Sequence, residues 1–327
     1  MNEKVRWGIV GAGNIAHRFA NAVKNAEGAE LVAIASRSDE KGSKFAKEHG
    51  IEHVYVGYEE LAKSVLVDAV YIATPHPQHV SCAKLFLNAK KHVLCEKPIC
   101  VNAKEAIELS ECAKKNGVFL MEAMWTRFLP AIIEAQAMIN RGEIGTIKNI
   151  QADFCYHYPF DITSRVYNPE LAGGGLLDVG VYCLHFASIF LGDYPEKIVA
   201  VGEVQDGIDH QVNYILQYKD GSIANLSSAV TVEKPATGYI YGTDGYIEIP
   251  NFFGANQLIL HKNGETSHIE KPYMGNGFED EITEVCNCIR LGKLQSDVIP
   301  LSKSIKMMEQ IDEIRRQIGL QYPFETL

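Results

Sequence analysis

The sequence predicts an α/β protein in which a doubly wound parallel sheet precedes an α+β domain with a large, open, mostly antiparallel sheet. The 327 residues suffice for about two domains of roughly 100 to 200 residues each. The first third alternates short apolar runs with helical patterns. Beyond Met121, apolar residues instead recur at every second position, as in strands that are covered on one face.

The first domain has the pattern of consecutive βαβ units. Its candidate strands contain few polar residues, which is typical of parallel strands buried on both faces. We expect strands at Val5 to Val10, Glu30 to Ala35, Ala69 to Ala73, His92 to Leu94 and Val118 to Met121. We expect helices between them at Ile15 to Asn25, Lys41 to His49, Gln78 to Ala89 and Ala103 to Asn116.

The second domain begins near Met121 to Met124, which divides the chain into domains 1–122 and 123–327. Three dipeptides, Asp220-Gly221, Asp244-Gly245 and Asn263-Gly264, supply the positive φ angles of hairpin turns. The expected strands are Ile150 to Tyr158, Ile198 to Val204, Gln211 to Tyr218, Ile223 to Val230, Gly238 to Tyr241, Tyr246 to Ile249 and Gln257 to Leu260. The expected helices are Leu129 to Asn140, Phe278 to Arg290 and Leu301 to Ile318.

Composition excludes several classes of protein. Apolar residues make up 46% and charged residues 22%, which excludes collagen-like and disordered chains. A net charge of −10 without a basic block argues against nucleic acid as a partner. No apolar run approaches a membrane span, and Met1 to Arg6 leads into a strand rather than a signal peptide. The eight cysteines, with Cys286 and Cys288 the only close pair, are expected to be free thiols in the cytoplasm.

A glycine-rich turn follows the first strand. Gly11 permits the tight turn, Gly13 lets the backbone approach a pyrophosphate, and Ala16 allows close helix packing. The amides of Asn14 and Ile15 open the helix that points at this phosphate. A turn also needs glycine for purely structural reasons. The position within a βαβ unit favours a Rossmann domain that binds a dinucleotide.

The end of the second strand predicts which dinucleotide is preferred. An NAD site carries an acid there, whereas this strand ends in Ser36 and Arg37. The Arg37 guanidinium can bind the 2′-phosphate of NADP(H), with a preference of about ten- to a hundredfold. The alternative is a solvated surface arginine. NADP(H) is therefore the preferred cofactor, and NAD(H) is the alternative.

Two further stretches carry candidate catalytic groups. Lys97 follows Glu96 at the carboxyl end of a strand, where such sheets bind ligands, and it either acts on substrate or pairs with Glu96. After three glycines from Gly173, Asp178, Tyr182 and His185 fall on one face of an apolar helix. They are a catalytic set or a buried polar network, and the network is the better interpretation for His185. The histidines at 76, 79, 157 and 185 lack ligand spacing, so no metal site is expected.

Together these motifs resemble the Gfo/Idh/MocA family of oxidoreductases along essentially the whole chain, with the dimeric dihydrodiol dehydrogenase branch the most similar. The resemblance is carried by Trp7 to Gly13, Ala73 to His76, Glu96 to Pro98, Met121 to Phe128 and Gly173 to Tyr182. It implies a cofactor-binding domain over 1–122 and a substrate-binding, dimerising domain over 123–327, with an active site between them. The exposed face of the second sheet, with its alternating aromatic residues, is expected to form the interface of a homodimer or a dimer of dimers.

The resemblance also implies residue roles. Lys97 corresponds to the family's essential lysine, and Arg165 matches a position that reaches the cofactor in some members. Tyr182 stands where the inositol branch carries histidine and the dihydrodiol branch carries tyrosine. The resemblance to the dihydrodiol branch implies that Tyr182 is the proton donor and acceptor, with Lys97 assisting it and Asp178 orienting the pair. The loop residues that match the family's cofactor-lining positions are Thr74, Pro75, His76 and His79.

The implied reaction is reversible hydride transfer between NADP(H) and a hydroxyl or carbonyl carbon. The candidate substrates are small molecules, namely sugars, polyols, dicarbonyl sugars and cyclic trans-diols. Phe154, Tyr156, Phe160 and Trp125 either wall a ring substrate or belong to the sheet core. Specificity is expected in the loops Tyr158 to Pro169 and Asn251 to Asn256. A dinucleotide-sensing regulatory protein is the rival, although it would not need Lys97; a structural dimer module is a third interpretation.

Overall fold

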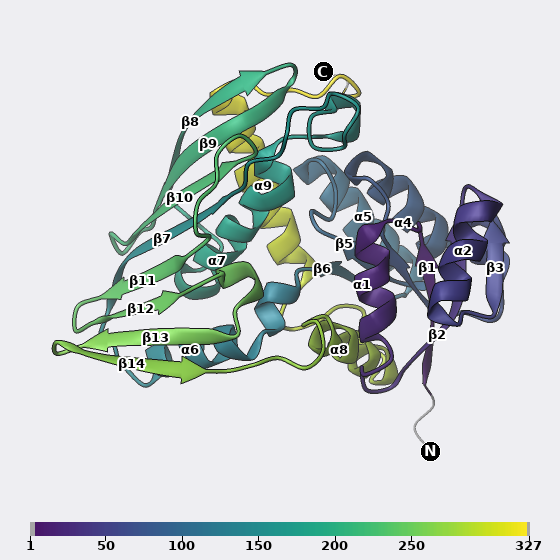
Figure 1. Ribbon diagram of the computed structural model, residues 1–327, viewed down its shortest axis with the longest axis horizontal. Helices are drawn as coiled ribbons and strands as arrows, with labels where there is room; N and C mark the ends of the chain where they lie inside the picture. Colours follow the sequence, from purple (N-terminus) through teal and green to yellow (C-terminus); the bar gives the residue numbers. More distant parts are fainter. Residues whose placement is uncertain (1–3, 326–327) are drawn as a thin grey trace. The chain divides into compact units, whose positions relative to one another are not determined.

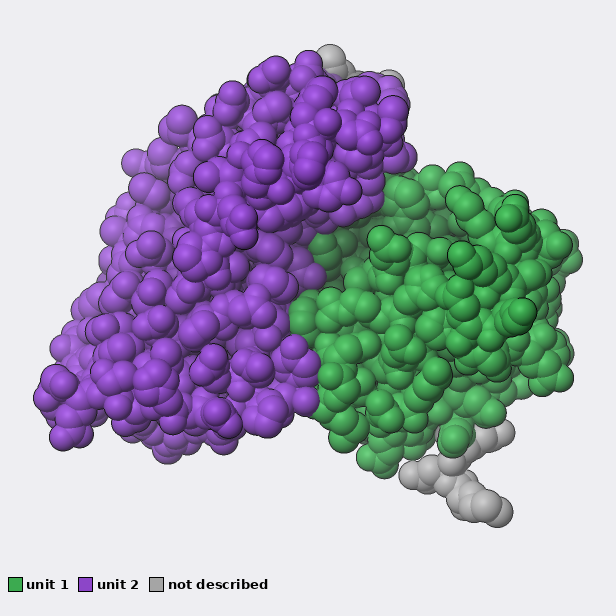
Figure 2. Space-filling model, in the orientation of Figure 1, with its two compact units in different colours: residues 1–100, 104–125, 274–305 green, residues 101–103, 126–273, 306–327 purple. Residues whose placement is uncertain are grey.

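A computed structural model describes residues 4–325 of the chain, so residues 1–3 and 326–327 at the ends of the predicted domains lie outside it. The described chain forms two compact units (Figure 2). The first contains residues 1–100, 104–125 and 274–305, and the second contains 101–103, 126–273 and 306–327. Each compact unit therefore contains several separate segments of the chain, and no single residue divides one unit from the other. The linear division at residue 122 stays a prediction about cofactor and substrate binding.

The first unit contains a six-stranded parallel sheet in the order β3-β2-β1-β4-β5-β6 (Figure 1). This order reverses direction at β1 and β4, which is the switch point where doubly wound sheets bind ligands. The strands are β1 (Val5–Val10), β2 (Ala29–Ser36), β3 (His53–Val56), β4 (Ala69–Ile72), β5 (His92–Glu96) and β6 (Leu120–Ala123). The predicted parallel sheet is confirmed, and β3 adds a strand that the sequence analysis did not identify.

The helices of this unit begin and end at residues suited to those positions. Ser38 accepts a hydrogen bond from the Lys41 amide at the start of α2, and Gly50 ends that helix in the left-handed conformation. The helices are α1 (Asn14–Ala22), α2 (Asp39–His49), α3 (Tyr58–Lys63), α4 (His79–Asn88), α5 (Ala103–Asn116) and α8 (Glu279–Arg290), with a short 3-10 turn at His76–Gln78. A second 3-10 turn, Trp125–Phe128, lies where the chain passes into the second unit. Helix α8 belongs to the first unit although its sequence follows the second sheet, because it packs against β2.

The second unit contains an eight-stranded sheet in the order β14-β13-β12-β11-β7-β10-β9-β8. Only β7 and β10 pair in parallel; the other neighbours are antiparallel. The three predicted hairpin turns lie between β9 and β10, β11 and β12, and β13 and β14, as expected. The strands are β7 (Ile147–Cys155), β8 (Lys197–Gln205), β9 (Ile208–Gln217), β10 (Ile223–Ala229), β11 (Gly238–Gly242), β12 (Tyr246–Ile249), β13 (Gln257–Lys262) and β14 (Glu265–Glu270).

Helices α6 (Pro130–Asn140), α7 (Val181–Leu191) and α9 (Leu301–Ile318) lie along one face of this sheet (Figure 1). The helices cover one face because the strands are apolar on that face only. In β9, for example, the buried residues Val212, Tyr214 and Leu216 alternate with exposed ones. The stretch Pro169–Leu191 is long and apolar enough to cross a membrane, but 83% of its most apolar window is buried inside the protein. The expectation that no apolar run reaches this length is wrong here, and the burial is that of a core helix.

Candidate functional site

The turn between β1 and α1 contains two glycines that differ in what the fold requires of them. Gly11 has φ +98°, and a Cβ there would lie 2.9 Å from the Ala73 carbonyl oxygen, so the backbone itself demands glycine. Gly13 has φ −87° and ψ 179°, and a Cβ there would meet nothing within 4 Å. Gly13 and Asn14 are exposed, and no side chain caps α1. This open backbone at a helix N-terminus fits a pyrophosphate.

Ser36 and Arg37 lie where β2 ends. Ser36 is buried, and its hydroxyl oxygen accepts a hydrogen bond from the Ser38 amide at 3.3 Å, which shapes the turn. Arg37 is exposed beside it. The end of β2 thus carries a cationic side chain and no acid at positions 36 to 38. A 2′-phosphate requires such a positive charge.

Lys97 follows β5, with Glu96 buried directly before it. The Glu96 carboxylate accepts hydrogen bonds from the Tyr71 hydroxyl and, at 3.1 Å, from the Lys97 amide. Burial raises the pKa of Glu96, whereas Lys97 and the Tyr71 hydrogen bond oppose that rise. Lys97 is half-buried at the carboxyl end of its strand, which is the edge where ligands bind in such sheets.

The loop after β4 is held in place by His79. The two ring nitrogens of His79 lie 2.8 Å from the carbonyl oxygens of Thr74 and Pro98. Two carbonyl acceptors favour a doubly protonated ring, whereas complete burial lowers the pKa of His79. His79, which was predicted to lie in the cofactor loop, is thus a buried residue whose ring connects the loop at Thr74 to the loop at Pro98. Thr74 and His76 are also buried in this loop, and Pro75 between them is half-buried.

In the second unit, Asp178 is the centre of a polar cluster. Its carboxylate accepts a hydrogen bond of 2.7 Å from the Tyr156 hydroxyl and two of 3.1 Å from the Arg165 guanidinium. Burial, and then the Asp178 charge, raise the pKa of Tyr156, so this phenol stays protonated and donates to Asp178. From the sequence, Tyr156 was expected either to wall a ring substrate or to belong to the sheet core, because nothing local marks Asp178 as its partner.

Tyr182 and His185 lie in different surroundings although both are on α7. The Tyr182 ring lies 5.6 Å from the Phe154 ring and 5.9 Å from the Phe253 ring, and those two phenylalanines stack at 4.0 Å. His185 is fully buried, and its Nδ1 accepts a hydrogen bond of 3.0 Å from Arg127. The interpretation of His185 as part of a buried polar network is confirmed.

The three glycines are explained by close packing at the start of this helical region. A Cβ on Gly173 would lie 2.5 Å from the Val166 carbonyl oxygen, and one on Gly174 would lie 2.2 Å from Asp209 Oδ1. The buried Asp209 carboxylate accepts a hydrogen bond of 2.7 Å from the Leu176 amide. Residues Leu176–Gly180 form a π-helical turn, so the regular α-helical spacing predicted from Asp178 to His185 is wrong in its first part.

Two of the four candidate wall aromatics have other surroundings. Trp125 is a core residue of the first unit, where its ring lies 5.2 Å from that of Phe278 and the Arg18 guanidinium lies over it. Phe160 is 64% exposed. Within the second unit, Phe253 takes the place beside Phe154, and it belongs to the loop predicted to govern specificity.

Comparisons with known proteins agree with this arrangement. Residues 5–124 match the family model of an oxidoreductase family with an NAD-binding Rossmann fold, and residues 132–248 match the GFO/IDH/MocA C-terminal domain. The chain is 38% identical to a trans-1,2-dihydrobenzene-1,2-diol dehydrogenase of Mus musculus and 36% identical to that of Homo sapiens. Each match covers 98% of both chains.

Solved structures show the same fold. An aldose-aldose oxidoreductase from Caulobacter crescentus gives a TM-score of 0.89 at 25% identity, and a 3-ketoreductase from Actinomadura kijaniata in complex with NADP and TDP-benzene gives 0.89 at 26%. Each covers 97% of this chain and 98% of its own. The chain therefore belongs to the GFO/IDH/MocA family, and it is an NAD(P)-binding oxidoreductase.

Proposed function

We propose that this protein is an NADP(H)-dependent oxidoreductase that transfers a hydride to or from the hydroxyl or carbonyl carbon of a polyhydroxylated substrate. The observation that carries the proposal is the open backbone at Gly13, where the fold alone does not require glycine and a pyrophosphate would. Cyclic trans-diols come first among the substrates, because the full-length relatives are named for one. Sugars, polyols and dicarbonyl sugars follow.

The cofactor would be held by groups of the first unit. The amides at Gly13, Asn14 and Ile15 would bind the pyrophosphate, and Ser36 and Arg37 the 2′-phosphate. The loop from Thr74 to His76, together with Glu96 and Lys97, would line the remainder, and Gly11 and His79 would hold the two loops in shape. When bound, the nicotinamide supplies or accepts the hydride.

Side chains of this protein would then exchange a proton with the substrate oxygen and stabilise its charge. We assign Tyr182 to carry the hydroxyl proton and Lys97 to stabilise the negative charge that develops on that oxygen. Asp178 is a positioning residue, since its carboxylate is already engaged by Tyr156 and Arg165. The stacked Phe154 and Phe253 beside Tyr182 offer an apolar surface to a ring.

We further propose that the enzyme acts on small molecules in the cytoplasm, without nucleic acid or membrane partners, as a homodimer or dimer of dimers. The support for assembly is the face of the second sheet opposite α6, α7 and α9. Its exposed apolar residues include Val199, Val201 and Ile215.

The test compares Lys97→Met and Tyr182→Phe with the parent enzyme in an NADP⁺-reduction screen over trans-diols, sugars and polyols. Loss of a general acid costs about 10² to 10⁴ in rate, so kcat should collapse in both variants while NADPH binding persists. Fluorescence titration with NADPH and NADH measures that binding, and the Arg37 assignment predicts tighter binding of NADPH.

Matched controls are Lys63→Met, on the exposed end of α3, and Tyr239→Phe, on β11. Both should keep parental turnover. Unchanged turnover in the Lys97 and Tyr182 variants would overturn the catalytic assignment. Tight NADPH binding without turnover on any substrate would favour a dinucleotide-sensing role instead.

A further inference from the structure

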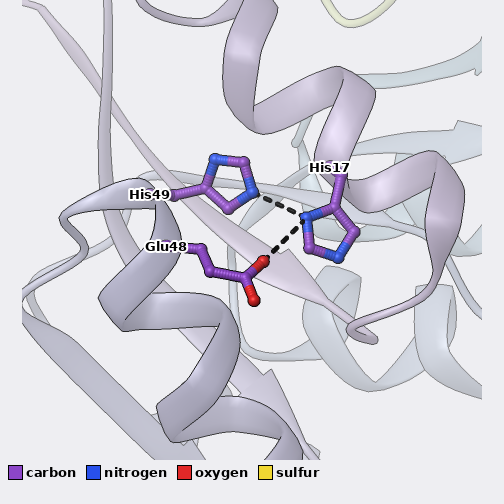
Figure 3. Close-up of side chains that lie close together, drawn as sticks. All are labelled: His17, Glu48 and His49. Atoms are coloured by element: carbon purple, nitrogen blue, oxygen red, sulfur yellow. Dashed lines mark hydrogen bonds and ion pairs between the residues drawn. The ribbon is translucent and has the colours of Figure 1, made fainter.

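A cluster of three metal-ligating side chains lies between α1 and the last turn of α2 (Figure 3). His17 Nδ1 is 2.7 Å from His49 Nε2 and 3.7 Å from Glu48 Oε2. The three candidate donor atoms all lie within 4.8 Å of one another. Two imidazoles and a carboxylate are a common donor set for zinc. None of these residues takes part in the proposed chemistry.

The spacing of the donors is close to that of a coordinated metal. Zn–N bonds of about 2.0–2.1 Å in tetrahedral geometry put neighbouring ligand atoms about 3.3 Å apart. The two imidazole nitrogens share one proton at 2.7 Å, and replacing that proton by a metal requires them to separate by a few tenths of an ångström. Small side-chain rotations provide this, because His17 is 38% and Glu48 44% exposed.

The rings are held in facing positions before any metal arrives. The Phe45 ring lies 4.5 Å from that of His17 and 4.6 Å from that of His49. His49 Nδ1 is buried without a hydrogen-bond partner among the described residues. It therefore lacks the second contact that usually strengthens a metal-binding histidine. We expect weaker binding than at a structural zinc site.

We propose that His17, Glu48 and His49 bind a divalent zinc ion, with solvent at the fourth position. Imidazole and carboxylate donors suit zinc, and they also suit the neighbouring metals nickel and copper. The site was missed in the sequence because its histidines are 32 residues apart on two helices. They show none of the local spacings by which zinc ligands are recognised. This proposal does not depend on the proposed enzymatic function.

The test is a titration of the chelator-treated full-length protein with Zn²⁺ in competition with a chromophoric chelator. We expect one Zn²⁺ per chain and a rise in melting temperature on binding. His17→Gln and His49→Gln should each weaken binding at least tenfold, because even the loss of a supporting residue behind a ligand costs about 10- to 100-fold. Glu48→Gln should weaken it less, since an amide oxygen remains.

His53→Gln is the matched control, because His53 lies in the same unit outside the cluster and should leave the affinity unchanged. Absorption of the Co²⁺ form should show ligation without a thiolate charge-transfer band, which excludes the free cysteines. If His49→Gln disturbs folding, the affinity of His17→Gln tests the proposal instead, because the His17 side chain is partly exposed. Parental affinity in both variants, or no saturable binding by the parent, would overturn the proposal.

Discussion

Glu281 is an acidic residue in the interior of the first unit, on α8. Its side chain is fully buried, and neither carboxylate oxygen has a hydrogen-bond partner among residues 4–325. Burial raises the pKa of Glu281 well above its usual value, the Glu96 charge adds to the rise, and Arg18 opposes it. The folded protein therefore keeps a proton that the unfolded chain releases above about pH 4.3. The contribution of Glu281 to stability is complete below that pH and is lost as the pH rises toward the folded-state pKa.

Glu281→Gln removes this dependence, because the amide is neutral at every pH. We expect the variant to gain in unfolding free energy over the parent by up to about 1.4 kcal/mol per pH unit above pH 4.3, until the folded-state pKa is reached. Urea denaturation at several pH values between 5 and 8.5 measures the difference. A difference that stays constant across this range would show that Glu281 is charged in the folded protein.

At the scale of single residues, the chemical type of a functional side chain could be predicted from the sequence better than its hydrogen-bond partners. Asp178 stood out because a carboxylate interrupts an apolar helix. Its partners Tyr156 and Arg165 come from elsewhere in the chain, and only the fold brings them within hydrogen-bond distance. Asp209 was not singled out in the sequence at all, because the Leu176 amide whose hydrogen bond it accepts lies 33 residues away. Local patterns carry no information about such long-range pairs.

Among the elements, the turn from β1 into α1 contains two glycines with different roles. The fold requires Gly11, whereas we assign Gly13 to cofactor binding. Gly13→Ala should change stability by less than about 1 kcal/mol, because the backbone is extended and the added methyl meets open space. The same methyl should weaken NADPH binding by about 1–3 kcal/mol, roughly 5- to 150-fold, as an overpacked contact does. Fluorescence titration and a thermal melt together measure both effects.

Gly11→Ala serves as the contrasting variant. It places a side chain at φ +98° against the Ala73 carbonyl, so it should cost about 1–3 kcal/mol in stability. If Gly13→Ala bound NADPH as tightly as the parent, the open backbone at Gly13 would not be the pyrophosphate site.

Helix α3 and strands β3 and β14 were not predicted from the sequence, and the two strands share a physical cause. Strand β3 has four residues, all half-buried or exposed, and β14 is a polar, largely exposed edge strand. Both pair with a neighbouring strand that supplies hydrogen bonds. Strand β3 is too short to show a period, and β14 lacks the apolar alternation on which the predictions relied. The π-helical turn at Leu176–Gly180 likewise has no residue pattern of its own. The strands that bury apolar residues were found, within a few residues of their ends.

For the whole molecule, the first unit is completed by a segment from far along the chain. Helix α8 buries Ile282, Val285 and Cys286 in this unit. Burial of an aliphatic side chain such as Ile282 or Val285 is worth about 1.5–3 kcal/mol. A fragment of residues 1–122 should therefore be markedly less stable than the unit it comes from. A chain joining 1–125 to 274–305 through a flexible linker should fold, since the rings of Trp125 and Phe278 lie 5.2 Å apart.

Urea denaturation of the two fragments, followed by circular dichroism, makes the comparison. The joined chain should unfold cooperatively at a higher urea concentration, and Ile282→Ala within it should shift the midpoint downward. Equal midpoints for both fragments would mean that α8 contributes nothing to the stability of the first unit.

The return of the chain to its first unit also sets the order of events during synthesis. After residue 125, the ribosome makes the 180 residues from 126 to 305 before the first unit has all of its parts. At about 5–20 residues per second this takes roughly 9 to 36 seconds. During that interval the nascent chain exposes the apolar surface that α8 later covers. Chaperones that hold apolar surface should therefore associate with ribosomes carrying between about 125 and 305 residues of this protein, and leave once α8 emerges.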